Sequence, residues 1–266
     1  MLQLKPGVKY DMPAAFGPSI FTPVTHVPNA TLISTSFESS HDAVAAILPP
    51  HLTVGDIPTV YINRLTYDSV DYLCGRGYEE VIVALDARYR HGEEDIAAPY
   101  ICAVWVNQVA ALTSGREFMG HPKLFADIPA LDESGESISF EAFEYGTCFL
   151  RGEVKGLKEL SSETVAKIKS NQTPYSLAWK YIAGPDGTVD VDYGTLLKME
   201  WNYEKAWVGE GEAHFQVAPR ERLPVSSHVV AALAALPVVK RRPTFMGKGP
   251  AVIHRAATRR LEKVQS

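Results

Sequence analysis

Cysteine pairs, long hydrophobic segments and an excess of positive charge are all missing from this sequence. Its three cysteines, Cys74, Cys102 and Cys148, lie far apart and form no CxxC pair, which argues against a disulfide framework or a zinc site. No segment approaches the roughly 18 consecutive apolar residues that cross a membrane. The N-terminal MLQLKPGVKYDMP has no apolar core of a signal peptide. These absences predict a cytoplasmic protein with reduced thiols and no membrane contact.

The charge distribution differs between the body of the chain and its C-terminal end. The formal net charge is -5, and no basic stripe interleaved with aromatic residues runs through the body, so nucleic-acid binding is not indicated. From residue 240 onward, however, the only acidic residue is Glu262, and the basic residues are Lys240, Arg241, Arg242, Lys248, Arg255, Arg259, Arg260 and Lys263. This segment predicts a solvated basic tail or a subunit contact, with an anion or RNA contact as the functional alternative.

The composition is that of a globular protein, with 46% hydrophobic and 21% charged residues among 266. No internal repeat and no low-complexity linker divides the chain. We therefore predict a single domain over 1–266, in which the proline-rich residues 1–28 form an extended N-terminal arm and residues 240–266 form the basic C-terminal tail.

Most of the chain is typical of β-strands. Segments rich in β-branched and aromatic residues are bounded by Gly, Pro, Asp or Asn at 30–40, 59–67, 78–89, 99–112, 137–157, 189–209 and 212–217. Helices are predicted at 41–52, where Ser39 or Ser40 caps the start, at 161–172, and at 226–237, whose almost wholly apolar face suggests burial in the core or at an interface. The predicted fold class is α+β, with a large antiparallel β-sheet or partly closed barrel and a few short helices.

The segment SGREFMGHPKLFADIP carries the candidate for chemistry. It places Lys123 among large apolar residues, with Phe118 and Met119 before it and Leu124 after it. Burial among such residues disfavours a charged amine, and a neutral amine can attack a carbonyl carbon. The alternative is a lysine whose ammonium group reaches the surface along the apolar side chains.

The same segment resembles a known family. GREFMGHPK is similar to the sequence around the Schiff-base lysine of the acetoacetate decarboxylase family, with Lys123 in the place of the nucleophile and His121 where the family has an aromatic residue. GYEE is similar to the family's Tyr-x-Glu and puts Glu80 at the pocket glutamate. HDAVAAILPPHL and AWVGEGEAHFQVAPRERLPV resemble further family segments in the same order. The resemblance implies the family's fold and a homo-oligomer, either a dimer, a tetramer or a larger assembly.

Three positions depart from the family pattern. Leu124 stands where a second lysine follows the nucleophile, Ala30 where the family has a pocket arginine, and Asn63 where it has a second pocket glutamate. A neighbouring cation is one way to favour the neutral form of a catalytic lysine, and acetoacetate decarboxylase is the standard example of that effect. Without that cation, hydrophobic surroundings must favour the neutral amine here.

These departures bear on the reaction. A Schiff base can lead to an enamine by loss of carbon dioxide, by loss of a proton or by cleavage of an aldol bond. Glu80 is the expected base, with Tyr78 on the same face of a strand and His121 near Lys123. We predict aldolase, dehydratase or hydratase chemistry on a 2-oxo acid such as pyruvate, with an aldehyde as partner in the aldol case. The alternatives are a true acetoacetate decarboxylase and a non-catalytic small-molecule binding protein.

The remaining pocket candidates have structural alternatives. Arg116 is either a partner for a substrate carboxylate or, as we prefer, a structural residue bonded to Glu117 or to backbone carbonyls. Asn63 and Gln108 are either hydrogen-bond donors to substrate or parts of an interior network. Phe118, Met119 and Leu124 are the expected apolar walls. HGEED at 91–95 is typical of a solvated loop, so we expect no metal and no organic cofactor.

Overall fold

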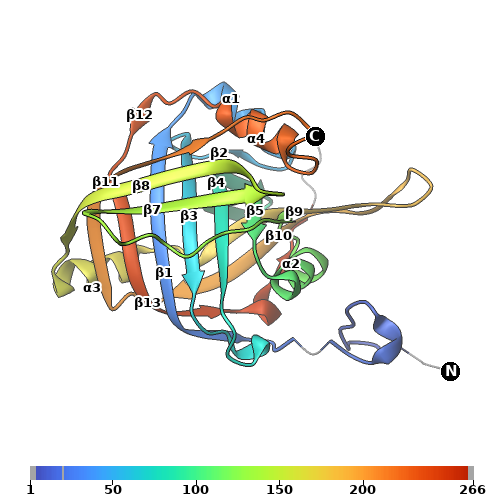
Figure 1. The fold of residues 1–266 in the computed structure, drawn as a ribbon. Helices are drawn as coiled ribbons and strands as arrows, with labels where there is room; N and C mark the ends of the chain where they lie inside the picture. The colour runs from blue at the N-terminus through green and yellow to red at the C-terminus, as the bar shows by residue number, and fades with distance from the viewer. Residues whose placement is uncertain (1–3, 20, 263–266) are drawn as a thin grey trace.

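The structure is a computed structural model that describes residues 4–19 and 21–262, and it is dominated by one large sheet (Figure 1). The strands are β1 (Thr25–Glu38), β2 (Thr53–Val54), β3 (Thr59–Tyr67), β4 (Tyr78–His91), β5 (Glu94–Val106), β6 (Lys123–Phe125), β7 (Ser137–Glu144), β8 (Thr147–Glu159), β9 (Tyr175–Ala183), β10 (Val189–Trp201), β11 (Lys205–Phe215), β12 (Lys240–Arg241), β13 (Thr244–Ile253) and β14 (Arg259–Arg260). The helical segments are η1 (Ala14–Phe16), α1 (His41–Ala45), η2 (Asp71–Leu73), α2 (Val109–Ser114), the π-helical turn η3 (Gly115–Met119), α3 (Ser162–Asn171), α4 (Ser227–Ala234) and η4 (Arg255–Ala257).

Seven strands of the sheet close into a ring. The order β1-β3-β4-β5-β9-β10-β13 returns to its start because β13 also pairs with β1. Nearly all pairings are antiparallel, and the exceptions among the described strands are the parallel pairs β5–β6 and β5–β9. The predicted fold class is therefore confirmed, with a mixed rather than purely antiparallel sheet.

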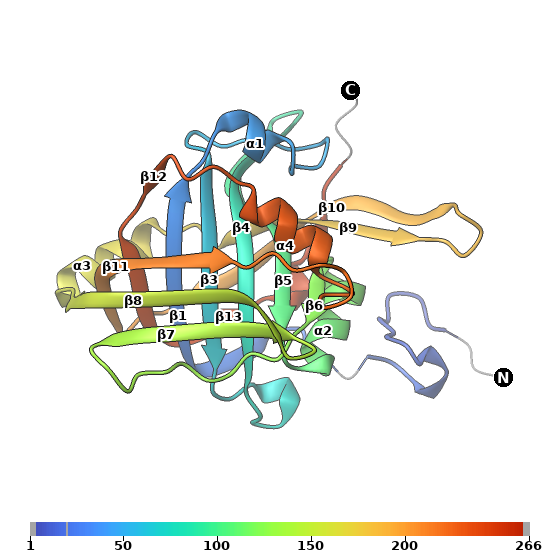
Figure 2. The same cartoon turned by 45° about the horizontal axis from the view of Figure 1, so that its top comes forward.

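One face of the ring strands carries the main hydrophobic core. The strands β7, β8 and β11 and helix α4 lie across β1, β3, β4 and β5 (Figure 2), and their apolar residues meet those of the ring in one large cluster. On β4, alternate residues Val81, Val83 and Leu85 belong to this cluster and have no exposed surface. Successive side chains of a strand point to opposite faces, so Tyr78, Glu80 and Ile82 point the other way.

Several local predictions are confirmed and others are wrong. Ser40 caps α1 as predicted, by accepting a hydrogen bond from the backbone N–H of Ala43. The predicted helix at 161–172 is present as α3, which Ser161 caps in the same way. The predicted strand at 99–112 ends at Val106, because Gln108 caps a helix that begins at Val109. Helix α4 buries a single stripe rather than a whole apolar face, since its alanines on the outer side are exposed.

The structure corrects the prediction that residues 240–266 form a basic C-terminal tail. Residues 240–253 form β12 and β13, and β13 is an interior strand that pairs with β1, β10 and β11. Its charged neighbours are paired rather than free, because Arg241 lies 3.1 Å from Glu212 and Lys248 lies 3.8 Å from Glu133. Glycine and proline in TFMGKGPAVI obscured the strand pattern. Lys263 lies outside the described residues.

The N-terminal arm is shorter than predicted. Strand β1 begins at Thr25, so Pro28 lies within the sheet and not at the end of an arm. The residues before it include one short 3₁₀ turn, and those at 1–3 and 20 lie outside the described part of the chain. In the described ranges 4–19 and 21–262, no helix combines the length and hydrophobicity needed to cross a membrane.

Candidate active site

The segment that carries Lys123 is held by the turn that precedes it. Lys123 begins β6, and the preceding π-helical turn runs from Gly115 to Met119. A Cβ on Gly115 would lie 2.7 Å from Cδ of Lys123, so the absence of a side chain there lets the lysine pass. Nη1 of Arg116 donates a hydrogen bond of 3.0 Å to the carbonyl oxygen of Lys123, which is the structural role that we preferred for this arginine. Gly120 adopts φ 80°, which favours glycine.

Lys123 and Glu80 form a buried pair. The ammonium nitrogen of Lys123 donates a hydrogen bond to Oε1 of Glu80, and the two side chains are 6% and 4% exposed. Glu80 lies on β4 and Lys123 on β6, and both strands pair with β5, on which Val106 is the register partner of Glu80 and Val104 that of Lys123. Burial disfavours both charges, whereas their mutual attraction favours them. Removing either residue would therefore leave an unpaired buried charge, and a ligand that binds beside the pair would change its electrostatic surroundings. The amine thus lies in an ion pair, but one that borders a cavity.

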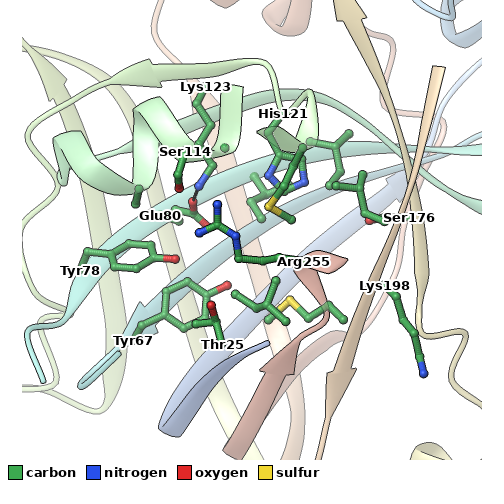
Figure 3. Close-up of a pocket in the computed structure, with 18 of the residues that line it drawn as sticks. Thr25, Tyr67, Tyr78, Glu80, Ser114, His121, Lys123, Ser176, Lys198 and Arg255 are labelled. Carbon is green, nitrogen blue, oxygen red and sulfur yellow. Dashed lines mark hydrogen bonds and ion pairs between the residues drawn. The ribbon is translucent and has the colours of Figure 1, made fainter. Parts of the chain in front are cut away.

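The cavity has a free volume of about 80 Å³ (Figure 3). It contains five of the residues expected from sequence, namely Tyr78, Glu80, Met119, His121 and Lys123. Its other walls are mainly apolar side chains from α2, β4, β5, β10 and β13. An apolar cavity of roughly 150 Å³ holds benzene, so this smaller space suits a molecule of a few heavy atoms.

Three tyrosines supply hydroxyl groups at one side of the cavity. Tyr67 and Tyr78 are register partners on β3 and β4, with ring centroids 4.7 Å apart. Tyr72 on η2 shares hydrogen bonds with Tyr78 and with Ser114. Burial, and then the nearby Glu80 charge, raises the pKa of Tyr72 to about 12 and those of Tyr67 and Tyr78 well above their ordinary value. All three are therefore neutral hydrogen-bond donors at physiological pH.

His121 is a neutral group in this cavity. Burial, followed by the charge of Lys123, lowers the pKa of His121 to about 3. Neither ring nitrogen has a hydrogen-bond partner among the described residues. The imidazole can therefore donate or accept a hydrogen bond when a ligand enters, but it does not supply positive charge.

Besides Arg116, four of the candidate pocket residues do not line the cavity. Asn63 lies on the cavity face of β3, but beyond the cavity, with a buried Oδ1 that has no partner in the described chain. Gln108 caps α2 by accepting a hydrogen bond from the N–H of Ala110 at 3.2 Å. Phe118 packs with a small cluster beside the cavity, and Leu124 packs into the main core. The alternation of β6 explains Leu124, because the residue after Lys123 must face the opposite side.

The sequence did not indicate several cavity residues. The most important is Arg255 on η4, which is 3% exposed and borders the same cavity as Lys123 (Figure 3). Arg255 was missed because it lies among other basic residues in the segment 240–266, for which the sequence predicts a basic tail. Tyr67, Tyr72 and Ser114 were also missed. The alternation of TVYINRLTY could have pointed to Tyr67, but only with the register of β3 against β4 in hand.

A comparison with models of protein families finds one match for this chain. The family model of acetoacetate decarboxylase (ADC) matches residues 11–251. Among curated proteins, no sequence relative matches.

Solved structures with the same fold share little sequence with this chain. An acetoacetate decarboxylase structure is 14% identical, with a TM-score of 0.76 and coverage of 96% of both chains. The acetoacetate decarboxylase of Legionella pneumophila is 16% identical, with a TM-score of 0.73 and coverage of 93% of this chain and 92% of that one. The enduracididine biosynthesis enzyme MppR, complexed with the condensation product of pyruvate and imidazole 4-carboxaldehyde, is 14% identical, with a TM-score of 0.70 and coverage of 97% and 98%.

Proposed function

Because the chain belongs to the acetoacetate decarboxylase family, we propose that it is a lyase in which Lys123 forms a Schiff base with a small oxo acid. The observation that carries this proposal is the hydrogen bond between Lys123 and Glu80 at the wall of a small cavity. A lysine nucleophile needs a partner that can take its proton, and a carboxylate in direct contact is such a partner.

The first step uses both members of the pair. Transfer of a proton from the ammonium group to Glu80 gives a neutral amine and a neutral acid, a form that burial favours. The amine attacks the carbonyl carbon and forms a carbinolamine. The carboxylic acid of Glu80 then gives its proton to the departing hydroxyl group, so water leaves and a protonated imine remains beside the Glu80 carboxylate.

The second step converts the imine into an enamine. The Glu80 carboxylate removes a proton from the carbon next to the imine carbon, and the electrons of that C–H bond form a carbon–carbon double bond while the imine π electrons move to nitrogen. The enamine carbon can attack the carbonyl carbon of an aldehyde, and the protonated Glu80 gives its proton to the aldehyde oxygen, which becomes a hydroxyl group while the imine re-forms. If the Glu80 carboxylate then removes the second proton from the same carbon, the new enamine breaks the C–O bond, and the hydroxyl group takes the proton back from Glu80 and leaves as water; the reverse sequence adds water. We therefore favour aldolase, dehydratase or hydratase chemistry on a 2-oxo acid such as pyruvate.

Two observations support this preference over decarboxylation. The hydroxyl groups of Tyr67, Tyr72 and Tyr78 stay protonated and can stabilise the oxygen of an acceptor carbonyl, which decarboxylation does not need. The structural neighbour MppR was solved with pyruvate and with a pyruvate condensation product. The second candidate is decarboxylation of acetoacetate, which the similarity to two acetoacetate decarboxylases favours.

The test is covalent trapping. The protein is incubated with pyruvate or acetoacetate in the presence of borohydride, and the modified residue is identified by mass spectrometry of peptides. We expect one adduct at Lys123, lost in Lys123→Met. The matched control is Lys198→Met, because Lys198 borders the same cavity but turns its side chain away and pairs with Glu200 at 2.7 Å (Figure 3).

The outcomes separate the candidates. An adduct that survives in Lys123→Met would overturn the assignment of the nucleophile. Carbon dioxide released from acetoacetate faster than aldehyde-dependent condensation of pyruvate would favour the decarboxylase. No adduct with either oxo acid would reject the Schiff-base proposal as a whole.

A further inference from the structure

Arg255 is a charged residue in the cavity that the proposed chemistry has not yet used. It lies on η4, directly after β13, and its side chain extends toward Glu80, Ser114 and Lys123 (Figure 3). The N–H of Ala256 donates a hydrogen bond of 2.8 Å to the carbonyl oxygen of Pro23, which ties this turn to the chain just before β1. The backbone of the turn that carries Arg255 is therefore held in place by the chain segment before β1.

The surroundings of Arg255 hold its charge without neutralising it. Nη2 is buried and has no hydrogen-bond partner among the described residues, and no carboxylate in 4–19 or 21–262 forms an ion pair with it. The charge of Asp11 acts on it only from a distance. Three aromatic rings surround Cζ, with centroids at 4.4, 5.1 and 5.7 Å for Phe21, Phe118 and Tyr72. Rings orient a guanidinium and stabilise its charge, but they leave its donors unsatisfied.

A buried donor without a partner costs free energy, and a planar guanidinium matches a carboxylate with two parallel hydrogen bonds. Building on the proposed function, we propose that Arg255 binds the carboxylate of the oxo acid while Lys123 binds its carbonyl carbon, and that this carboxylate stays on the product. The substrate class is then a 2-oxo acid, in which the carboxylate is bonded directly to the carbon that becomes the imine.

The energetic reason lies in the difference between substrate and transition state. If the carboxylate held by Arg255 left as carbon dioxide, its charge would pass to the imine and the ion pair would be lost as the bond broke. An interaction that is stronger in the ground state than in the transition state slows a reaction. In proton loss next to the imine and in condensation, the carboxylate keeps its charge throughout, so the ion pair costs nothing at the transition state.

A second cation stands on the outer side of the same aromatic wall. Nζ of Lys9 lies 3.8 Å from the ring centroid of Phe118, whose ring also faces Arg255. Both cations border an outer cavity, and Arg255 also borders the inner one. Two positive charges on this wall favour a negatively charged ligand over a neutral carbonyl compound.

The test compares two ligands that differ only in charge. The concentration that gives half-maximal borohydride trapping is measured for pyruvate and for pyruvamide, in which a neutral amide replaces the carboxylate. In Arg255→Met we expect this concentration to rise about 100-fold for pyruvate, as for loss of a charged hydrogen bond, and less than about threefold for pyruvamide. Arg260→Met is the matched control, because Arg260 stacks on Tyr193 at 4.0 Å outside the cavity, and it should change neither value.

A second variant guards against misfolding. Arg255→Lys keeps the charge but loses the two-point contact, and we expect about a tenfold rise for pyruvate with no change for pyruvamide. If the concentration for half-maximal trapping changed equally for pyruvate and pyruvamide in both variants, or did not change, the role of Arg255 would be overturned. A Lys123 adduct in the wild-type protein would still support the Schiff base in that case. Absence of any wild-type adduct would overturn both.

The retained carboxylate is tested separately in the wild type. Exchange of the methyl protons of pyruvate for deuterium, followed by NMR, reports enamine formation, and carbon dioxide release reports decarboxylation of acetoacetate. We expect the exchange to be at least tenfold faster than the release. A faster release of carbon dioxide would show that the bound carboxylate leaves and would overturn the 2-oxo acid assignment.

Discussion

The two faces of strand β4 have opposite characters although they alternate residue by residue. Val81, Val83 and Leu85 face a close-packed apolar core, whereas Tyr78 and Glu80 face a cavity with charged and hydroxyl groups. The first face gains free energy from burial, and the second spends part of it on keeping polar groups away from water. Strand β4 therefore belongs both to the core and to the candidate site. The packing of its core face holds the polar residues of its cavity face in position.

The largest effect should come from removing the carboxylate on the cavity face. In Glu80→Gln the amide keeps the shape but cannot take a proton from Lys123 or from the substrate, so the rate of deuterium exchange into pyruvate should fall by about 10²- to 10⁴-fold. The adjacent Glu79→Gln is the control. Glu79 pairs with buried Arg64 away from the cavity, so its loss should lower the midpoint of thermal unfolding and leave the rate unchanged. Equal rate losses in both variants would break the comparison.

The core face should respond in the opposite way. Leu85→Ala leaves a void in the main cluster, and we expect the free energy of unfolding to fall by about 2–5 kcal/mol in urea titrations. The exchange rate per folded molecule should stay the same, because Leu85 does not border the cavity. If the rate fell with the stability, the two faces would not be separable in function.

A smaller effect should follow from displacing Lys123, the proposed nucleophile, without changing any polar group. In Gly115→Ala the new Cβ would overlap Cδ and Cε of Lys123, and a shift of about 1 Å should slow adduct formation by roughly 10²-fold. The backbone of Gly115 is helical, so the fold should tolerate alanine. Gly135→Ala is the control, since a Cβ there meets nothing closer than 3.9 Å. An unchanged rate in Gly115→Ala would mean that the lysine reacts from another position.

The smallest effect concerns pH and His121. The pKa of His121 is about 3 in the folded protein and 6.5 ordinarily, so the unfolded state binds more protons between these values. Stability from the neutral imidazole is complete above pH 6.5 and is lost as the pH falls toward 3. At pH 5 the loss from this group should be about 2 kcal/mol. Urea unfolding at pH 7.5 and pH 5 should show a smaller pH dependence in His121→Gln, and an equal dependence would refute the assignment.

The sequence predicted what depends on neighbours along the chain. Ser40 caps its helix as expected, because capping is decided within three residues. The position of Tyr78 and Glu80 on one face also followed, because alternation is a local property of a strand.

What failed depends on pairing between distant segments. Arg255 and Tyr67 enter the cavity through the registers of β13 and β3, which no local pattern specifies. The expectation for Leu124 failed for a local reason instead: it directly follows the lysine on β6, and the alternation that turns Lys123 toward the cavity turns Leu124 toward the main core. The basic residues after position 240 suggested a tail, but their partners come from strands elsewhere in the sheet.

The closure of the ring by β1 and β13 joins the first long strand of the chain to the last. Pairings of such high contact order form slowly, and during synthesis β13 leaves the ribosome after nearly all of the remaining strands. The turn that carries Arg255 follows β13 directly, and Thr25 at the cavity wall begins β1. A nascent or C-terminally truncated chain that stops before β13 therefore lacks Ile253 and Arg255, so the wall of the cavity is incomplete until this strand and turn have joined β1.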